Sequence, residues 1–212
     1  MILGYEIVKP RRLEFEKKTK TDRYAKLLAG PFERGYAITV GNSLRRMLLS
    51  SIVGSAIVGV KLEGVYHEFS AIPGVLEDVT DIILNLKQVK LKITGEASTK
   101  RIFLKADKPG PVKVGDITPD PDVELLNEDF QIATIDENGS LDMEMIISKG
   151  RGYVPAEQHE LQDESIQLIP IDSIFSPVEK VTFSVDKTRV GDSSDYDSLM
   201  MEICTNGSIT PE

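Results

Sequence analysis

The sequence has few of the residue types on which catalytic and metal centres usually depend. Its 212 residues include a single cysteine, Cys204, and two histidines, His67 and His159. One cysteine can form neither an intramolecular disulfide nor a cysteine-based zinc site, which fits a reducing compartment. The histidines lie far apart, and neither belongs to an H-x-x-x-H or H-x-E arrangement. A surface or structural role is the better interpretation of both, because a catalytic histidine needs placed partners.

Motifs of nucleophilic and phosphate chemistry are also missing. The sequence contains no G-x-S-x-G elbow, no G-x-x-x-x-G-K-[ST] loop and no strand-linked G-x-G-x-x-G. Its densest acidic cluster consists of Asp116, Asp120 and Asp122, but prolines stand where a calcium loop needs flexible ligands and a central glycine. We therefore predict no catalytic residue, no metal site and no cofactor in this chain.

Long apolar runs are absent as well. The longest, residues 47–60, spans about 14 residues, contains serines and is too short to cross a membrane. The N-terminal sequence MILGYEIVKPRR carries charges where a secretory signal is apolar. We expect a cytoplasmic protein that makes no membrane contact.

The charge balance is acidic, with 25 basic and 34 acidic residues and a net charge of −9. Because nucleic-acid affinity depends on phosphate neutralisation, this balance disfavours direct binding of DNA or RNA. It favours docking with basic protein partners. Hydrophobic residues make up 41% of the chain and are spread along it, so a sizeable core is expected.

One amphipathic segment is the clearest helix in the sequence. Its apolar stripe has helical spacing and consists of Val40, Leu44, Met47, Leu48, Ser51 and Ile52. We predict that Gly54 ends this helix as a C-terminal glycine. A second stripe, of mixed chemistry, consists of Asn42, Arg46, Leu49 and Val53. A helix with one apolar and one mixed side is expected to have two different neighbours.

The remaining sequence predicts mostly strands and turns. We expect a hairpin over residues 11–28, after which Gly30-Pro31 breaks the strand pattern. A second helix is expected over residues 75–89. Residues 130–135 and 140–148 are expected to pair as a hairpin around Asn138-Gly139, with positive φ in the turn. Further strands are predicted at residues 56–62, 66–69, 89–94, 101–106, 123–126, 168–174, 178–185 and 198–205. Thr210-Pro211-Glu212 has the pattern of a helix start, which suggests a fragment of a longer chain.

Five segments together resemble the N-terminal part of the bacterial RNA polymerase alpha subunit. They are ERGYAITVGNSLRRMLLSS (33–51), GVYHEFSAIPGVLEDVTDIILNLK (64–87), KGRGYVPA (149–156), SPVEKVTFSVDKTRVG (176–191) and ICTNGSITPE (203–212). They occur in the family's order over nearly the whole chain. The resemblance implies an α+β fold of two subdomains. The expected dimerisation subdomain comprises residues 1–53 and 175–212, and a mostly-β subdomain is inserted at residues 54–174.

The resemblance also implies a function. A homodimer of alpha subunits would nucleate assembly by docking the beta and then the beta-prime subunit, whereas nucleotidyl transfer would belong to those large subunits. The family's chains continue through a second dimer helix, a linker and a DNA-binding domain that this sequence does not include. We therefore assign no direct nucleic-acid binding to it.

Site residues follow by matching positions of the family's motifs. The expected contacts with the beta subunit are Asn42, Arg46, Leu49, Arg151 and Tyr153. The expected contacts with beta-prime or another large-subunit surface are Lys87, Ile171 and Asp172. The expected dimer contacts are Tyr36, Val40 and Met47. The sequence cannot divide the apolar stripe between core and dimer interface. For the loop at Arg151 and Tyr153 a purely structural role is an equal alternative.

Two other functions stay open from the residues alone. One is a homodimeric binding module that serves a partner other than RNA polymerase. The other is a stand-alone enzyme that uses a divalent metal at residues 116–122.

Overall fold

The computed structural model describes residues 10–118, 120–159, 167–191 and 193–212. Most of the regular structure is strand, and the described residues contain two α-helices, which confirms the predicted α+β class. The chain divides into two compact units. Unit 1 combines both ends of the chain, Met1–Ile52 and Pro177–Glu212, and unit 2 is Val53–Ser176.

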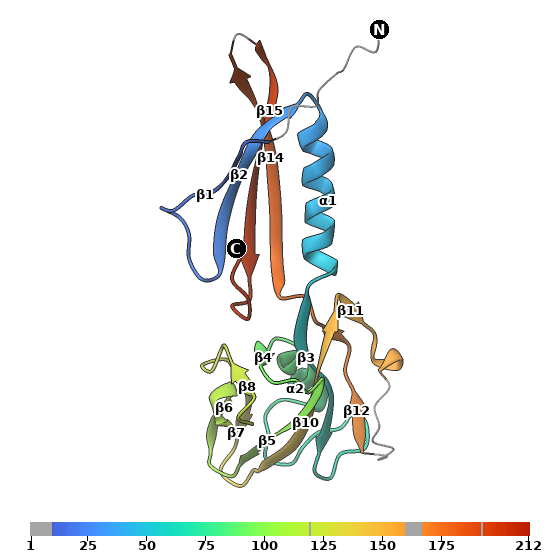
Figure 1. The fold of residues 1–212 in the computed structure, drawn as a ribbon. Coiled ribbons are helices and arrows are strands. Elements are labelled where there is room, and N and C mark those ends of the chain that lie inside the picture. Colours follow the sequence, from blue (N-terminus) through green and yellow to red (C-terminus); the bar gives the residue numbers. More distant parts are fainter. Residues whose placement is uncertain (1–9, 119, 160–166, 192) are drawn as a thin grey trace. The chain divides into compact units, whose positions relative to one another are not determined.

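Unit 1 is a four-stranded antiparallel sheet with one helix against it (Figure 1). Its strand order is β1-β2-β15-β14, so a strand from the start of the chain pairs with one from its end. The elements are β1 (Arg12–Phe15), β2 (Tyr24–Glu33), α1 (Tyr36–Ser50), β14 (Val178–Val190) and β15 (Ser193–Thr205).

Alternation along the strands decides which face of this sheet α1 covers. Ala29 and Leu199 are register partners, and both are buried with Ala37 of α1. Gly41 allows the close approach, because a Cβ there would lie 2.7 Å from a ring carbon of Phe183. The apolar face of the sheet therefore packs against one side of α1.

The start of α1 depends on a glycine and a buried carboxylate. Gly35 precedes the helix with a φ of 82°, a conformation that side chains disfavour. Its N–H donates to Oδ2 of Asp197 at 2.7 Å. A carboxylate at this end also interacts favourably with the helix dipole. Residues from the two ends of the chain thus fix where α1 begins.

Two predicted boundaries in the first third of the chain were wrong. Gly30-Pro31 does not end the strand, because β2 continues to Glu33 and pairs Phe32 with Asp197 of β15. Gly54 does not cap α1, because the helix ends at Ser50 and Gly54 pairs with Gly150 in a sheet of unit 2. Tertiary strand pairing overrides the local turn and cap signals at both places.

Unit 2 is built on a five-stranded sheet of order β12-β3-β10-β5-β7 (Figure 1). Its strands are β3 (Val53–Leu62), β5 (Thr99–Ala106), β7 (Ile117–Thr118), β10 (Leu141–Arg151) and β12 (Leu168–Pro170). Three two-stranded ribbons join β4 (Leu91–Ile93) to β8 (Val123–Leu125), β6 (Gly110–Lys113) to β9 (Gln131–Ile135), and β11 (Tyr153–Val154) to β13 (Ser173–Ile174). The helical elements are α2 (Val79–Leu86) and the short 3-10 turns η1 (Val114–Asp116) and η2 (Ala156–Gln158).

One large core fills most of unit 2, beside a smaller cluster of Val58, Ile146 and Phe175. Alternate residues of β10, including Met143, Met145 and Ile147, point into it, and α2 adds Ile82 and Leu86. All five side chains are almost completely buried. The period of two in the strand and the helical spacing in α2 place them on inward faces.

Three sequence predictions in unit 2 were wrong in instructive ways. The predicted second helix is shorter than residues 75–89, because the Asp78 side chain accepts the Asp81 N–H and caps α2 there. Residues 66–69 form no strand. The predicted hairpin does not exist, since β9 pairs with β6 while β10 pairs with β3 and β5.

The Asn138-Gly139 turn is present, but its glycine is needed for a reason other than the predicted positive φ. Gly139 is not among the glycines of positive φ. Instead, the backbone of Gly74 lies so close to Gly139 that an added Cβ would collide with the Gly74 carbonyl oxygen. The glycine at position 139 is therefore required by packing between backbones.

Candidate functional site

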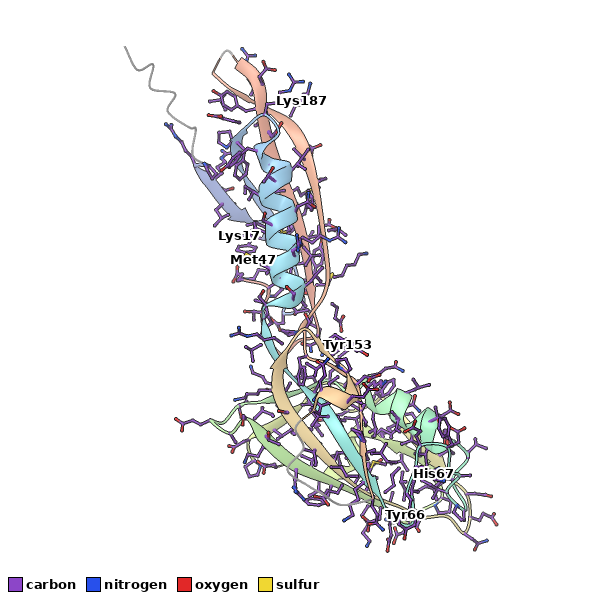
Figure 2. The ribbon with its side chains drawn as sticks, turned by 90° about the vertical axis from the view of Figure 1, so that its right-hand side faces the viewer. Lys17, Met47, Tyr66, His67, Tyr153 and Lys187 are labelled. Atoms are coloured by element: carbon purple, nitrogen blue, oxygen red, sulfur yellow. The ribbon has the colours of Figure 1, made fainter. Side chains whose placement is uncertain are left out.

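Helix α1 leaves a row of large apolar side chains uncovered. We define the apolar flank as Tyr36, Val40, Leu44 and Met47. Met47, labelled in Figure 2, is 60% exposed, and Tyr36 is 53% exposed, whereas Val40 is half-buried against the sheet. At about 100° per residue these positions fall on one side of the helix. The structure thus divides the predicted apolar stripe into a flank that is exposed and residues that pack inward.

The inward side of α1 includes residues from both predicted stripes. Leu48, Leu49 and Ile52 are half-buried and pack on a cluster formed by Val181, Met201 and their neighbours. Leu49 therefore contributes to the core of unit 1, and only part of its side chain can meet another protein.

A second flank of α1 is polar and lies roughly 130° around the helix from the first. We define the polar flank as Asn42, Arg46 and the exposed part of Leu49. Asn42 and Arg46 are exposed. Within the part of the chain that the structure describes, no hydrogen bond or ion pair joins the Arg46 guanidinium to another residue. This cation is held on a rigid helix with its donors pointing to solvent.

In unit 2 the fold brings together predicted site residues that are distant in sequence. Lys87 at the end of α2 places its Nζ 3.1 Å from Oδ2 of Asp172. The other carboxylate oxygen accepts the Ala156 N–H at 2.9 Å. The Ala156 N–H, then Lys87, and a hydrogen bond from Tyr153 together lower the pKa of Asp172. Lys87, Tyr153 and Asp172 therefore form one polar network.

An exposed apolar pair lies beside this network on the β11–β13 ribbon. Tyr153, labelled in Figure 2, and Ile174 are cross-strand partners, and they are 60% and 64% exposed. Arg151 ends the preceding strand and is also exposed. We define the ribbon patch as Arg151, Tyr153 and Ile174. An aromatic, an aliphatic and a guanidinium side by side have the composition of protein interfaces.

Sequence reasoning missed Ile174 and misplaced Ile171. Ile171 is only 1% exposed and belongs to the core of unit 2, so its side chain has no surface to offer a partner. Ile174 points outward between the buried residues Ser173 and Phe175, and the sequence Ser-Ile-Phe has no alternation of polar and apolar residues that could have predicted this. A β-branched aliphatic side chain in the outward position of a strand is the residue to suspect.

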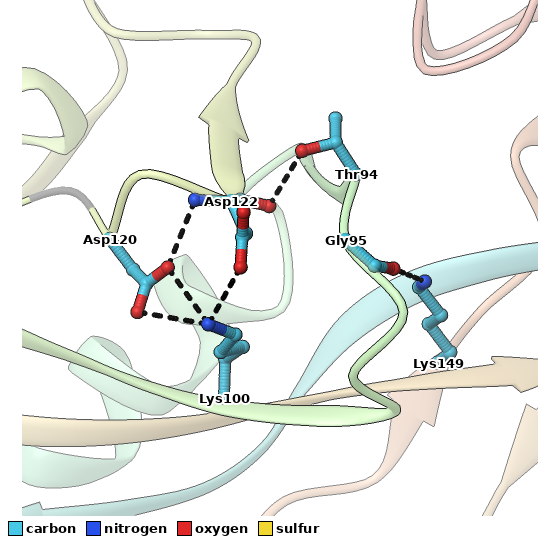
Figure 3. Close-up of polar contacts among 6 residues, drawn as sticks. All are labelled: Thr94, Gly95, Lys100, Asp120, Asp122 and Lys149. Atoms are coloured by element: carbon cyan, nitrogen blue, oxygen red, sulfur yellow. Dashed lines mark hydrogen bonds and ion pairs between the residues drawn. The ribbon is translucent and has the colours of Figure 1, made fainter.

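The acidic cluster at residues 116–122 does not assemble as a metal-binding group. Lys100 Nζ lies between Asp120 and Asp122, at 3.1 Å and 2.9 Å from their carboxylates (Figure 3). The hydrogen bonds that Lys100 donates to Asp122 and then to Asp120 raise the pKa of Lys100. The Asp116 carboxylate instead accepts the Lys113 N–H. Among the residues described, no three His, Cys, Asp or Glu side chains group as metal ligands.

The two histidines are separate and have local contacts. A ring nitrogen of His67 lies 3.1 Å from the Ser70 hydroxyl. His159 packs edge-on against Phe175 with ring centroids 6.1 Å apart, and burial lowers its pKa. These contacts fit the structural role predicted for both residues.

Over the described residues, neither helix has the length and apolar character needed to cross a bilayer.

Comparison with known proteins finds one consistent set of relatives. A sequence model described as the RNA polymerase Rpb3/RpoA insert domain matches residues 60–176. The chain is 54% identical over 208 residues to a protein of Desulfitobacterium hafniense (strain DSM 10664 / DCB-2), covering 98% of this chain and 65% of that protein. It is 52% identical to a protein of Geobacter metallireducens, covering 98% and 61% of the two chains, and 51% identical to one of Symbiobacterium thermophilum, covering 100% and 66%.

All three relatives bear the name DNA-directed RNA polymerase subunit alpha. The chain spans about 65% of the length of the first of them.

Proposed function

The chain belongs to the RNA polymerase alpha-subunit family, as its sequence motifs predicted, and from this premise we propose that it is a non-catalytic assembly subunit of that enzyme. In this proposal two copies form a cytoplasmic scaffold that docks the beta and beta-prime subunits for transcription. Nucleotidyl transfer would take place in those large subunits. The observation that carries the proposal is that α1 exposes two chemically different flanks on one rigid helix.

The apolar flank is proposed to meet a second copy of the chain. We propose unit 1 as the dimerisation subdomain, with Tyr36, Val40 and Met47 at the interface. Exposed apolar side chains gathered on one side of a helix typically mark an interaction surface. A symmetric dimer places the same flank of each copy against the other, so one apolar flank can cover its own counterpart.

The polar flank is proposed to dock the beta subunit through Arg46. A guanidinium offers five donors in a rigid fork and is weakly hydrated, so it can be buried against carboxylates or carbonyls. Asn42 adds an amide beside it, and the exposed part of Leu49 adds apolar contact. Arginines of this kind dominate the energetics of many interfaces.

The inserted unit 2 is proposed to supply the second contact with the large subunits. The ribbon patch would bind beta through Arg151 and Tyr153, and the Lys87–Asp172 pair would bind beta-prime or another large-subunit surface. Because Tyr153 donates a hydrogen bond to Asp172, these two sets form one continuous surface. Ile171 would act only by supporting Asp172 from the core.

A reconstitution experiment tests this proposal. We expect Arg46→Ala to fold normally but to lose co-purification with beta when the chain is expressed with both large subunits. Loss of a buried, hydrogen-bonded charge at an interface costs about 2–5 kcal/mol of binding free energy. If this weakens the complex of the variant with beta to a micromolar Kd or above, the complex is no longer recovered on purification. The matched control is Arg45→Ala, because Arg45 is also exposed and lies on the same helix.

Two results would contradict the proposal. One is recovery of the complete polymerase at wild-type yield with Arg46→Ala. The other is recovery, by the unaltered chain, of a partner unrelated to RNA polymerase in place of beta, which would favour the alternative of a homodimeric binding module.

A further inference from the structure

Unit 1 has a cavity on the face of its sheet that α1 does not cover. Arg12 pairs with Gly30 in the β1–β2 ladder, and Glu14 pairs with Leu28. These residues alternate with Ala29, which faces α1, so they lie on the opposite face. The cavity here has a volume of about 660 Å³ and is also lined by Ser198 of β15.

Arginines are concentrated around this cavity. Arg11 and Arg12 line it from the β1 side, and Arg189 lines it from the end of β14. Within the described residues, Glu14 is the one acidic side chain in the lining. The cavity wall therefore carries an excess of two positive charges, whereas the chain as a whole has a net charge of −9.

Hydrogen bonds to the backbone fix the chain at Arg11 and the side chain of Arg189. The Arg11 N–H donates to the Gly30 carbonyl at 3.0 Å, which ties the start of β1 to β2. Arg189 Nε donates to the Gly191 carbonyl at 2.8 Å, which orients its guanidinium at the tip of the β14–β15 hairpin. The Arg189 guanidinium, which is held in this way, loses less conformational entropy when it binds a ligand.

We propose that this cavity binds a small phosphate-bearing anion. A phosphate monoester carries about −1.5 to −2 charges at pH 7, which matches the excess charge of the wall better than a single carboxylate does. Guanidinium forks bind phosphate oxygens in pairs. The volume lies within the range of about 300–1,000 Å³ that is usual for small-ligand sites. A nucleic-acid strand would extend beyond the cavity along a chain whose net charge is −9, which disfavours it.

Titration calorimetry at low salt tests the proposal with two probes of matched shape, phenyl phosphate and benzoate. We expect phenyl phosphate to bind at least about tenfold more tightly than benzoate, because its second charge adds a charge-assisted contact. Arg12→Gln should weaken phenyl phosphate binding by about tenfold or more, since one guanidinium is lost. Lys180→Gln is the matched control: it removes one positive charge from the same sheet, outside the cavity, and should leave binding unchanged.

Two outcomes would overturn the proposal. The first is absence of saturable phenyl phosphate binding in the millimolar range. The second is equal weakening by Arg12→Gln and Lys180→Gln, which would indicate a general charge effect. If circular dichroism shows that Arg12→Gln disturbs β1, Arg189→Gln provides the same test from β14, and it should also weaken binding by about tenfold.

Discussion

The two units of this chain bury their apolar residues in different ways. Unit 2 has one large core beside a smaller cluster, and most of the large, fully buried side chains, such as Leu62, Leu104 and Met145, belong to that core. Unit 1 divides its buried residues between two small clusters under α1 and leaves Tyr36 and Met47 exposed on that helix. Both units leave apolar side chains exposed, with Phe69, Leu76 and Ile174 among those of unit 2, but unit 2 has a large core of its own, whereas unit 1 has only two small clusters beside its exposed apolar flank. We infer that a partner of unit 1 contributes to its stability.

The largest expected effect tests the self-contained core of unit 2. Leu104→Ala should lower the free energy of unfolding by about 2–5 kcal/mol, because it leaves a cavity in a close-packed interior. Chemical denaturation measures this loss. Phe103→Ala is the control, since Phe103 is the adjacent residue of β5 and is half exposed. Equal losses for the two variants would show that unit 2 lacks the closed core described above.

A smaller effect is expected at the seam between α1 and its sheet. Gly41→Ala should lower the free energy of unfolding by about 1–2 kcal/mol, because the clash with the Phe183 ring exceeds the gain in helix propensity. Thermal unfolding of the chain measures the change. Ser43→Ala, at an exposed position of the same helix, should be neutral or slightly stabilising. A stabilised Gly41→Ala variant would mean that α1 packs more loosely than its contacts indicate.

The smallest effect concerns the polar network of unit 2 and depends on pH. Folding lowers the pKa of Asp172. The Asp172 carboxylate therefore stabilises the fold at pH values above its pKa in the unfolded chain, which is near 4. This contribution is lost as the pH falls through the pKa of Asp172 in the folded chain. Asp172→Asn should therefore flatten the pH dependence of stability below about pH 4. The change should be at most about 1 kcal/mol, because the pair with Lys87 is partly exposed to solvent.

Denaturation at pH 2 to 6 measures that dependence for Asp172→Asn and for Asp129→Asn, whose carboxylate is fully exposed. Identical pH profiles for the two variants would contradict the role given to the Ala156 N–H and Lys87.

Sequence patterns predicted the parts of this fold that local chemistry decides. The helical stripe that α1 carries and the strand segments at residues 178–185 and 198–205 follow from periodicity alone, whereas the predicted strand at residues 168–174 is divided into β12 and β13. The failures were in long-range pairing: Gly54 reads locally as a helix cap, but its ladder with Gly150 makes it part of a strand. Strand β9 pairs with β6, which lies more than fifteen residues earlier in the sequence, and no local turn signal predicts this pairing.

At the candidate site, too, the sequence predicted local features and missed those that depend on tertiary packing. Sequence spacing predicted that α1 has two sides, yet only packing shows that Leu49 turns partly inward while Tyr36 and Met47 remain outside. Lys87 and Asp172 are 85 residues apart and meet only in the folded chain. Exposure and distance are tertiary properties, so the motifs could propose contact residues without separating Ile171 from Ile174.

Sedimentation equilibrium of the chain and two α1 variants tests the central claim, that the flanks of this helix serve separate partners. The unaltered chain and Arg46→Ala should have the mass of a dimer, whereas Met47→Glu should have the mass of a folded monomer, because it introduces a charge into the apolar flank alone. A monomeric unaltered chain, or a Met47→Glu variant that dimerises as tightly as the unaltered chain, would contradict it.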